Sequence, residues 1–253
     1  MSCYGPGVFR LRVGPSTKPD YGLVVGRTKA CTVAHEEGGA WTFTAGDTTL
    51  EITATPLRFR LLLRGVPIVG SITDEHFRGW TRLPSFGRVR QGGHWTAALA
   101  LASGEPVYGL GEKFGPLNKR GQLIHSRVVD ALGVNTGLAY KNAPFAWSPG
   151  TGKGAWGLLV HTPASVTHGV GHPDWSHRSY VVDVEDEALD LFLFAADAPG
   201  RHPRSVHATH GARRDGPAVE PRSVGVARVL QDAGGSRRRG GEASRCTGFP
   251  ATC

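Results

Sequence analysis

The 253-residue sequence predicts an all-β protein, either a sandwich or a barrel, and three observations support this class. Apolar residues recur in short runs with the period of two that is typical of half-buried strands. Thirty-six glycines and seventeen prolines favour many turns and few long helices. No stretch before Gly200 has the pattern of an amphipathic helix of three turns. Short strands separated by turn signals are typical of sandwiches and barrels.

The first hundred residues contain a series of expected strands. In order, these are Val8–Val13, an extended run over Tyr21–Val33, a hairpin of Trp41–Thr44 and Thr48–Thr53, then Leu57–Leu63, Val66–Val69 and Trp95–Leu101. The Ala45-Gly46-Asp47 sequence is a turn signal between the two hairpin strands. Pro67 predicts an edge position, because proline has no N–H to donate to a neighbouring strand. Scattered turn residues between Phe77 and Gly93 predict a connecting segment.

Three further strands are expected in the second half, at Trp156–His161, Ser179–Val184 and Leu189–Phe194. The acidic run Asp183–Glu187 lies between the last two, so we expect a solvated turn. His168, His172 and His177 crowd one stretch around Trp175. Its Gly and Pro spacing does not match that of converging metal ligands, so we expect a surface loop and no bound metal.

The composition changes after Gly200. Residues 201–253 contain ten Arg, no Lys and four acids, a net charge of +6, which leaves +2 of the total +8 for residues 1–200. Large apolar residues are too few there to offset the entropy of ordering. We therefore predict a sandwich over residues 1–200 and an Arg/Gly-rich tail over 201–253, either disordered or translated out of frame. A nucleic-acid partner would depend on this tail alone.

Neither the cysteines nor the apolar runs indicate an extracellular or membrane protein. The spacing of Cys3, Cys31, Cys246 and Cys253 matches no zinc pattern and no disulfide framework. No secretory signal and no stretch of about 20 apolar residues is apparent. We expect a cytoplasmic protein with free thiols, no cofactor, no nucleic-acid partner and no membrane association.

The stretch from Tyr108 to Trp147 is the most informative part of the chain. It opens with Tyr108-Gly109-Leu110-Gly111-Glu112-Lys113-Phe114 and ends with Ala139-Tyr140-Lys141-Asn142-Ala143-Pro144-Phe145. Both ends combine aromatic and charged residues with glycine or proline, which shape the backbone. Such a mixture predicts a shaped loop on a rigid sheet, where ligand-contacting residues tend to occur.

Four motifs together resemble a known family. They are the two motifs above, Arg120-Gly121-Gln122 between them, and Gly154-Ala155-Trp156-Gly157-Leu158-Leu159-Val160 after them. In this order they are similar to the N-terminal domain of family 31 glycoside hydrolases, of the α-xylosidase and α-glucosidase type, over residues 1–200. The resemblance implies a galactose-mutarotase-like antiparallel β-sandwich. In the family a catalytic (β/α)8 barrel follows and carries two aspartates for retaining hydrolysis of α-glycosidic bonds, which requires carboxyl groups about 5 Å apart.

The resemblance implies a binding loop and no catalytic residue. The family's nucleophile motif, an Asp shortly before Gly-Glu or Asn-Glu, is absent, and the residues after Gly200 are too few for a barrel of about 250 residues. In the family, a loop of the sandwich reaches the rim of the sugar site. The candidate substrate-binding residues here are Asp130, Tyr140, Lys141, Asn142 and Phe145.

Structural alternatives exist for each candidate. Asp130 would cap a turn, Tyr140 and Phe145 would pack within the loop, and Lys141 and Asn142 would brace a turn. Glu112 is expected to bond the backbone of its own glycine turn.

Three functions remain open from the sequence. The first is the non-catalytic N-terminal domain of an α-glycosidase, inactive alone, with α-linked xylosides or glucosides as ligands and an oligomer formed through the sandwich. The second is a stand-alone carbohydrate-binding sandwich. The third is a nucleic-acid binder that uses the basic tail.

Overall fold

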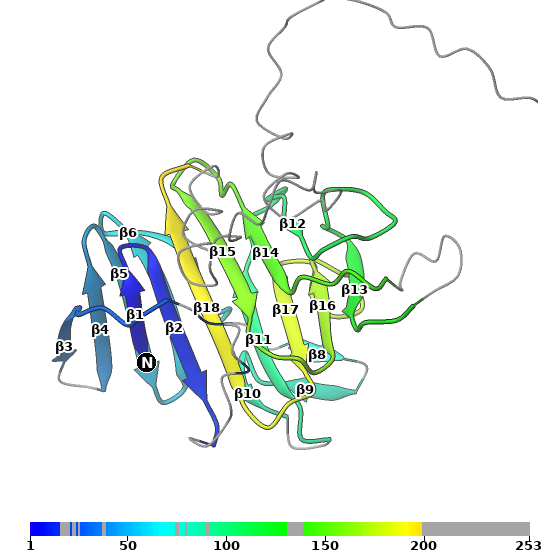
Figure 1. The fold of residues 1–253 in the computed structure, drawn as a ribbon, viewed down its shortest axis with the longest axis horizontal. Coiled ribbons are helices and arrows are strands. Elements are labelled where there is room, and N and C mark those ends of the chain that lie inside the picture. Colours follow the sequence, from blue (N-terminus) through cyan, green and yellow to red (C-terminus); the bar gives the residue numbers. More distant parts are fainter. Residues whose placement is uncertain are drawn as a thin grey trace, which may run out of the picture.

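The computed structural model describes residues 1–15, 21, 24, 26–36, 39–73, 76–78, 80–89, 92–130 and 139–198. These residues form eighteen strands and no helix (Figure 1). The strands make three antiparallel sheets and one two-stranded hairpin, which confirms the predicted all-β class and its antiparallel sandwich. The predicted tail, residues 201–253, lies outside the described residues. No apolar helix of membrane-spanning length occurs in the part of the chain described.

The first sheet has six strands in the order β1-β2-β18-β15-β14-β12. Their bounds are β1 Ser2–Gly5, β2 Val8–Val13, β18 Leu189–Ala196, β15 Ala155–Val160, β14 Phe145–Ser148 and β12 Tyr108–Gly109. The N-terminal strand β2 therefore pairs directly with β18, the last described strand. This pairing joins the two ends of the described chain in the middle of one sheet (Figure 1).

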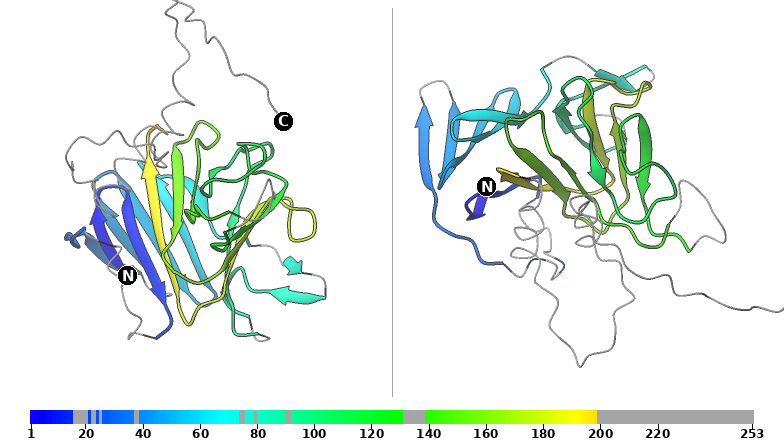
Figure 2. Two further views of the ribbon diagram at one scale, coloured as in Figure 1. Left: turned by 45° about the vertical axis from the view of Figure 1, so that its right-hand side comes forward. Right: turned by 90° about the horizontal axis from the view of Figure 1, so that it is seen from above.

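The other two sheets have five strands each. One has the order β10-β11-β17-β16-β13, with β10 Phe86–Arg88, β11 Trp95–Ala100, β17 Ser179–Val184, β16 Val166–Val170 and β13 Gln122–Ser126. The other runs β3-β4-β5-β6-β7, with β3 Thr32–Glu36, β4 Ala40–Ala45, β5 Thr48–Ala54, β6 Leu57–Leu63 and β7 Val66–Gly70. A hairpin of β8 His76–Arg78 and β9 Thr81–Leu83 extends beside them (Figure 2).

One hydrophobic core is shared by all three sheets. The strands alternate, so residues of one parity face inward. Phe9 of β2, Leu191 of β18 and Trp156 of β15 line it from the six-stranded sheet, while Leu99 of β11 and Leu61 of β6 line it from the other two. Each of these side chains is almost completely buried. The two five-stranded sheets therefore cover the same face of the six-stranded sheet.

The second face of the six-stranded sheet is also apolar. Its cluster contains five buried side chains, namely Val8, Phe145, Trp147, Phe192 and Phe194. All five belong to β2, β14 or β18 of that one sheet. Both faces of these strands are therefore buried, which explains why β18 is apolar at almost every position.

Most of the predicted strands are confirmed. β2 and β6 have the predicted bounds, and β4 and β5 form the predicted hairpin, with Gly46 at a φ of 64° in its turn. β7, which contains Pro67, is an edge strand as predicted.

Two predictions were wrong. The segment Phe77–Gly93, predicted to be a connection, contains β9, β10 and part of β8. Strands of three residues are too short for their periodicity to be detected, and β10 forms because it pairs with β11. Within the predicted run Tyr21–Val33, strand structure begins only at Thr32 among the described residues.

Candidate functional site

The two ends of the Tyr108–Trp147 stretch lie side by side. β12 and β14 pair antiparallel, with Tyr108 opposite Trp147. Beyond this pair, the Leu110 N–H donates to the Phe145 carbonyl at 2.9 Å, and the Glu112 N–H donates to the Lys141 carbonyl at 3.0 Å. The stretch is therefore a loop closed at its base by backbone hydrogen bonds.

The two glycines of the Gly-Leu-Gly motif make this close approach sterically allowed. Gly109 and Gly111 have φ values of 105° and 80°, which residues with a side chain rarely adopt. A Cβ atom on Gly111 would lie 2.5 Å from the Lys141 carbonyl oxygen, and one on Gly109 would collide with the Phe145 carbonyl oxygen. Leu110 between them also has a positive φ, 69°, and its side chain is fully buried. Burial of this leucine anchors the turn despite its strained backbone.

A second closure lies further along the same loop. Val128 and Ala139 form a parallel bridge, and the Val129 N–H donates to the Ala139 carbonyl at 3.2 Å. Asp130 follows directly and is exposed. Residues 131–138, between the two sides of this closure, lie outside the described residues.

Asn142 ties the closures together. Its Nδ2 group donates to the Arg127 carbonyl at 2.9 Å and to the Ala139 carbonyl at 2.7 Å, while its Oδ1 accepts from Lys113 Nζ at 2.6 Å. Lys113 Nζ also donates to the His125 carbonyl at 2.8 Å. Burial lowers the pKa of Lys113, and the charge of Lys119 adds to the effect. Because all these donors and acceptors of Asn142 have partners, its side chain positions the loop.

Tyr140, Lys141 and Glu112 form an exposed group on this braced loop. The Tyr140 side chain is 57% exposed. Lys141 Nζ lies 5.6 Å from the centre of the Tyr140 ring and 3.6 Å from Glu112 Oε2. Glu112 thus pairs with Lys141, whereas the sequence predicted a contact within its own turn. An aromatic face beside a cation and a carboxylate can contact both the C–H face and the hydroxyl groups of a sugar.

Phe145 is part of the packing. Only 2% of it is exposed, and its ring meets Phe194 edge to face at a centroid distance of 5.7 Å. It also packs on Gly157, where an added Cβ would lie 3.0 Å from the Phe145 ring. The expectation that its ring faces a sugar is therefore corrected, and the aromatic residues of the stretch that reach solvent are Tyr140 and Phe114.

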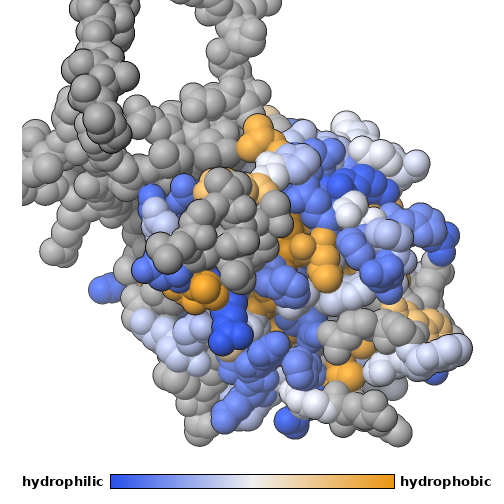
Figure 3. All heavy atoms as spheres, turned by 90° about the vertical axis from the view of Figure 1, so that its right-hand side faces the viewer, coloured by the Kyte–Doolittle hydropathy of each residue, from blue (hydrophilic) through white to orange (hydrophobic). Residues whose placement is uncertain are grey.

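The surface around this loop is mixed. Figure 3 shows the side of the molecule that carries β13, where apolar patches interrupt a largely hydrophilic surface. The large apolar side chains exposed on β13 and the adjoining loops are Phe114, Leu117, Leu123 and Val128.

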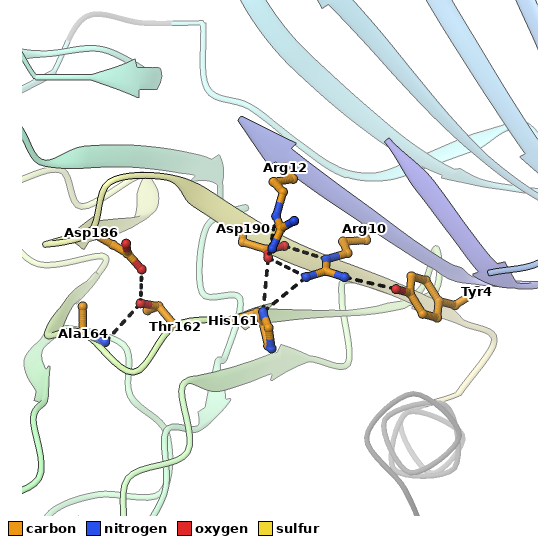
Figure 4. Close-up of polar contacts among 8 residues, drawn as sticks. All are labelled: Tyr4, Arg10, Arg12, His161, Thr162, Ala164, Asp186 and Asp190. Atoms are coloured by element: carbon orange, nitrogen blue, oxygen red, sulfur yellow. Dashed lines mark hydrogen bonds and ion pairs between the residues drawn. The ribbon is translucent and has the colours of Figure 1, made fainter. Parts of the chain in front are cut away.

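A buried polar cluster, drawn in Figure 4, lies on the second face of the six-stranded sheet. Asp190 of β18 accepts from Arg10 of β2, and His161 Nδ1 lies 3.1 Å from Asp190 Oδ2. Arg10 also donates to the Tyr4 hydroxyl at 3.1 Å. Arg10, His161 and Asp190 are all buried, so this cluster braces the sheet. The sequence contained a signal for this cluster, because Asp190 is the charged residue within the otherwise apolar strand β18.

The structure corrects the predicted histidine loop in part. His168 lies in β16, is fully buried and has hydrogen-bond partners on both ring nitrogens, the Tyr180 hydroxyl at 2.8 Å and the Ser126 hydroxyl at 3.1 Å. His172 and His177 lie in the connection that follows, where His177 is exposed. His168 is therefore a core residue, because its alternation along β16 points it inward.

The predicted acidic turn is also confirmed only in part. Glu185 and Glu187 are exposed, whereas Asp183 is buried in β17 with its Oδ1 3.3 Å from His94 Nδ1. The Thr162 hydroxyl donates to Asp186 (Figure 4). These carboxylates thus fix strands and turns.

Comparison with known proteins gives a consistent result. The model of the glycosyl hydrolase 31 N-terminal galactose mutarotase-like domain matches residues 1–168. An α-xylosidase of Emericella nidulans is 30% identical over 189 residues, which cover 69% of this chain and 23% of that protein. The chain thus spans about a quarter of the length of this relative.

Solved structures agree on the fold. A GH31 dextranase of Flavobacterium johnsoniae, complexed with glucose, has a TM-score of 0.61 at 17% identity and covers 82% of this chain and 25% of its own. A GH31 α-xylosidase from a soil metagenome, complexed with xylose, has a TM-score of 0.55 at 15% identity. The match covers 83% of this chain and 31% of the α-xylosidase chain.

Proposed function

This chain belongs to glycoside hydrolase family 31, and we propose that its sandwich acts as the N-terminal domain of an α-glycosidase and forms part of the rim of its sugar site. The observation that carries this proposal is the doubly closed loop, which holds Tyr140 and Lys141 in solvent on a rigid base. Loops of this kind, positioned by a rigid scaffold, are where binding residues concentrate.

The ligands that we propose are α-linked xylosides or glucosides. Support comes from the 30% identical α-xylosidase and from similar folds solved with glucose, xylose and isomaltotriose. Tyr140 would lie against the apolar face of a sugar ring, and Lys141 and Asp130 would meet its hydroxyl groups. Asn142 would act through the loop, because its own hydrogen-bonding groups are already used.

We propose that the sandwich binds without hydrolysing. Retaining hydrolysis needs two carboxyl groups about 5 Å apart on either side of the bond. In the exposed group, Glu112 is engaged with Lys141, and Asp130 lies on the other closure of the loop. The role of the domain is therefore to shape and hold the sugar.

The test uses the purified full chain. We expect no turnover of p-nitrophenyl α-xyloside or α-glucoside, and measurable hydrolysis would refute the non-catalytic role. Calorimetry with isomaltotriose and xylose should show weak binding that Tyr140→Ala removes. Trp41→Ala is the matched control, because Trp41 is a partly exposed aromatic residue on β4, in another sheet. Equal loss in both variants, or no heat with any sugar, would contradict the rim assignment.

The same calorimetry distinguishes the proposed rim domain from the alternative, a stand-alone carbohydrate-binding module. Such a module would bind an oligosaccharide tightly without further domains, whereas a rim domain contributes only part of the contacts. The cytoplasmic location that we propose is supported by the spacing of the four cysteines, which matches no disulfide framework. Oligomerisation through the sandwich remains a prediction, which sedimentation of the purified chain would test.

A further inference from the structure

We propose a second ligand site, for an oligosaccharide that carries a carboxylate, in the hollow between the start of β6 and the strands β9 and β10. This hollow has a volume of about 710 Å³. Its size is within the range of pockets that bind small molecules, about 300–1,000 Å³. In Figure 1, β9 and β10 lie at the opposite end of the molecule from β12, so this hollow is separate from the Tyr140 loop.

The lining combines an aromatic platform with positive charge. Trp80, in the turn between β8 and β9, is fully exposed. Arg58, Arg82 and Arg88 line the same hollow, and no carboxylate is among its described lining residues. An exposed indole face offers stacking area to the C–H face of a pyranose ring. Guanidinium groups bind carboxylates through two parallel hydrogen bonds.

Arg58 is the residue that most favours an anionic ligand. It is half-buried on β6, where its backbone pairs with Thr53 of β5. Its side chain makes no hydrogen bond or ion pair with any described residue, although a guanidinium carries five N–H donors. In contrast, the neighbouring Arg60 is paired with Glu51 at 2.6 Å. Among the described residues, the sheet therefore presents two arginines side by side, of which Arg60 has a carboxylate partner and Arg58 has none.

The shape of the surface favours a chain of sugars over a small anion. A second hollow of about 380 Å³ adjoins the first, because both are lined by Arg58 and Thr73. Four described residues that line the second hollow carry hydroxyl groups, namely Thr42, Thr53, Ser71 and Thr73. Its carboxylate, Glu51, is already paired with Arg60. Together the two hollows form a groove that has hydroxyl groups along its length, a cation at the junction and an indole at one end. This arrangement matches an acidic oligosaccharide.

The probe is α-1,4-linked trigalacturonic acid, and its neutral methyl ester is the matched ligand. Titration is followed by tryptophan fluorescence, since Trp80 is in solvent, and by calorimetry. We expect the acid to bind at least tenfold more tightly than the ester, with an affinity that falls as salt rises. Arg58→Ala and Trp80→Ala should each weaken binding of the acid about tenfold or more, and Arg58→Lys should have an intermediate effect.

Two variants serve as controls. Trp41→Ala removes a partly exposed tryptophan outside the groove, and Lys153→Ala removes an exposed cation outside it. Both should bind as the unmodified chain does. Equal affinity for acid and ester, or unchanged affinity in Arg58→Ala and Trp80→Ala, would overturn the proposal. Tighter binding of ATP or of a poly-aspartate peptide than of trigalacturonate would overturn its assignment to a glycan. Circular dichroism establishes that each variant is folded.

Discussion

Arg10 and Asp190 form a two-pronged ion pair between residues that are 180 positions apart in the sequence. Arg10 Nε donates to Oδ1 at 2.9 Å, and Nη2 donates to Oδ2 at 2.7 Å. Arg12 Nε adds a third bond to Oδ2 at 3.2 Å. Burial alone would raise the pKa of Asp190, but the hydrogen bonds from Arg10 and His161 outweigh it and hold the pKa well below its ordinary value. The pair joins β2 to β18 inside the sheet.

We therefore expect Asp190→Asn to destabilise the fold strongly. Removing one partner leaves Arg10 buried without its counter-charge, which typically costs about 3–5 kcal/mol. Urea unfolding at pH 7 measures the loss. Glu51→Gln is the control, because the Glu51–Arg60 pair is largely exposed and is expected to contribute no more than about 1 kcal/mol. Similar losses in the two variants would contradict the assigned role of the buried pair.

The same variant should change the response to acid. The pKa of Asp190 is lower in the folded than in the unfolded chain, so its contribution to stability is complete above about pH 4 and is lost as the pH falls below that value. The stability difference between the unmodified chain and Asp190→Asn should therefore shrink below pH 4. A difference that is constant from pH 7 to pH 3 would show that the charge of Asp190 is not the cause.

His168 should control stability at milder pH. Burial, with smaller contributions from Lys113 and His125, lowers the pKa of His168 to about 3. The unfolded chain, with a histidine pKa of about 6.5, binds more protons between these values, so stability should fall by roughly 1 kcal/mol per pH unit below pH 6.5. Urea midpoints at pH 7, 6, 5 and 4 measure the slope. His168→Gln should flatten it, and the exposed His177→Gln should not.

The motif glycines provide a steric test. Gly109→Ala places a Cβ against the Phe145 carbonyl and also strains a positive φ. Gly104→Ala strains a φ of 72° but meets no atom within 4 Å. We expect the control to cost about 1 kcal/mol and Gly109→Ala to cost clearly more, because backbone must also move. Thermal unfolding of both variants measures the difference. Equal costs would mean that the close approach to Phe145 is not a constraint.

Glu105 should be intolerant of substitution. Its buried Oε1 accepts from Trp156 Nε1 at 2.7 Å and from the Ser148 hydroxyl at 2.8 Å, while Oε2 accepts from the Ala102 N–H at 2.9 Å. Glu105→Ala leaves these donors without an acceptor, at about 1–3 kcal/mol for each one that stays buried. Chemical unfolding and near-UV circular dichroism, which reports on Trp156, measure the effect. A stable variant with unchanged tryptophan signals would contradict this role.

The sequence predicted those parts of the fold that local periodicity determines. β2 and β6 alternate clearly, and glycine marks the turn between β4 and β5, so their positions were recovered. β9 and β10 were missed because three residues carry no measurable period. Their positions depend on long-range contacts, such as the edge-to-face packing of Phe59 on Phe86 at 5.9 Å.

The candidate site was predictable as a place but not residue by residue. The Gly-Leu-Gly motif correctly indicated a shaped loop. Whether an aromatic residue of that loop reaches solvent depends on partners far along the chain. Phe145 is buried by Phe194, whereas Tyr140 has no such cover. Asn142 was placed among the binding residues because its bonds to Lys113 and Arg127 are tertiary and have no local sequence signal.

The bridge between Val128 and Ala139 lies outside the three sheets of the sandwich. It brings Asp130, two residues after Val128, to the same part of the loop as Tyr140, which directly follows Ala139. No ladder between the described strands runs through this bridge. Ligand preference and scaffold stability can therefore be engineered separately, by changing the side chains beside the bridge while every strand keeps its partners.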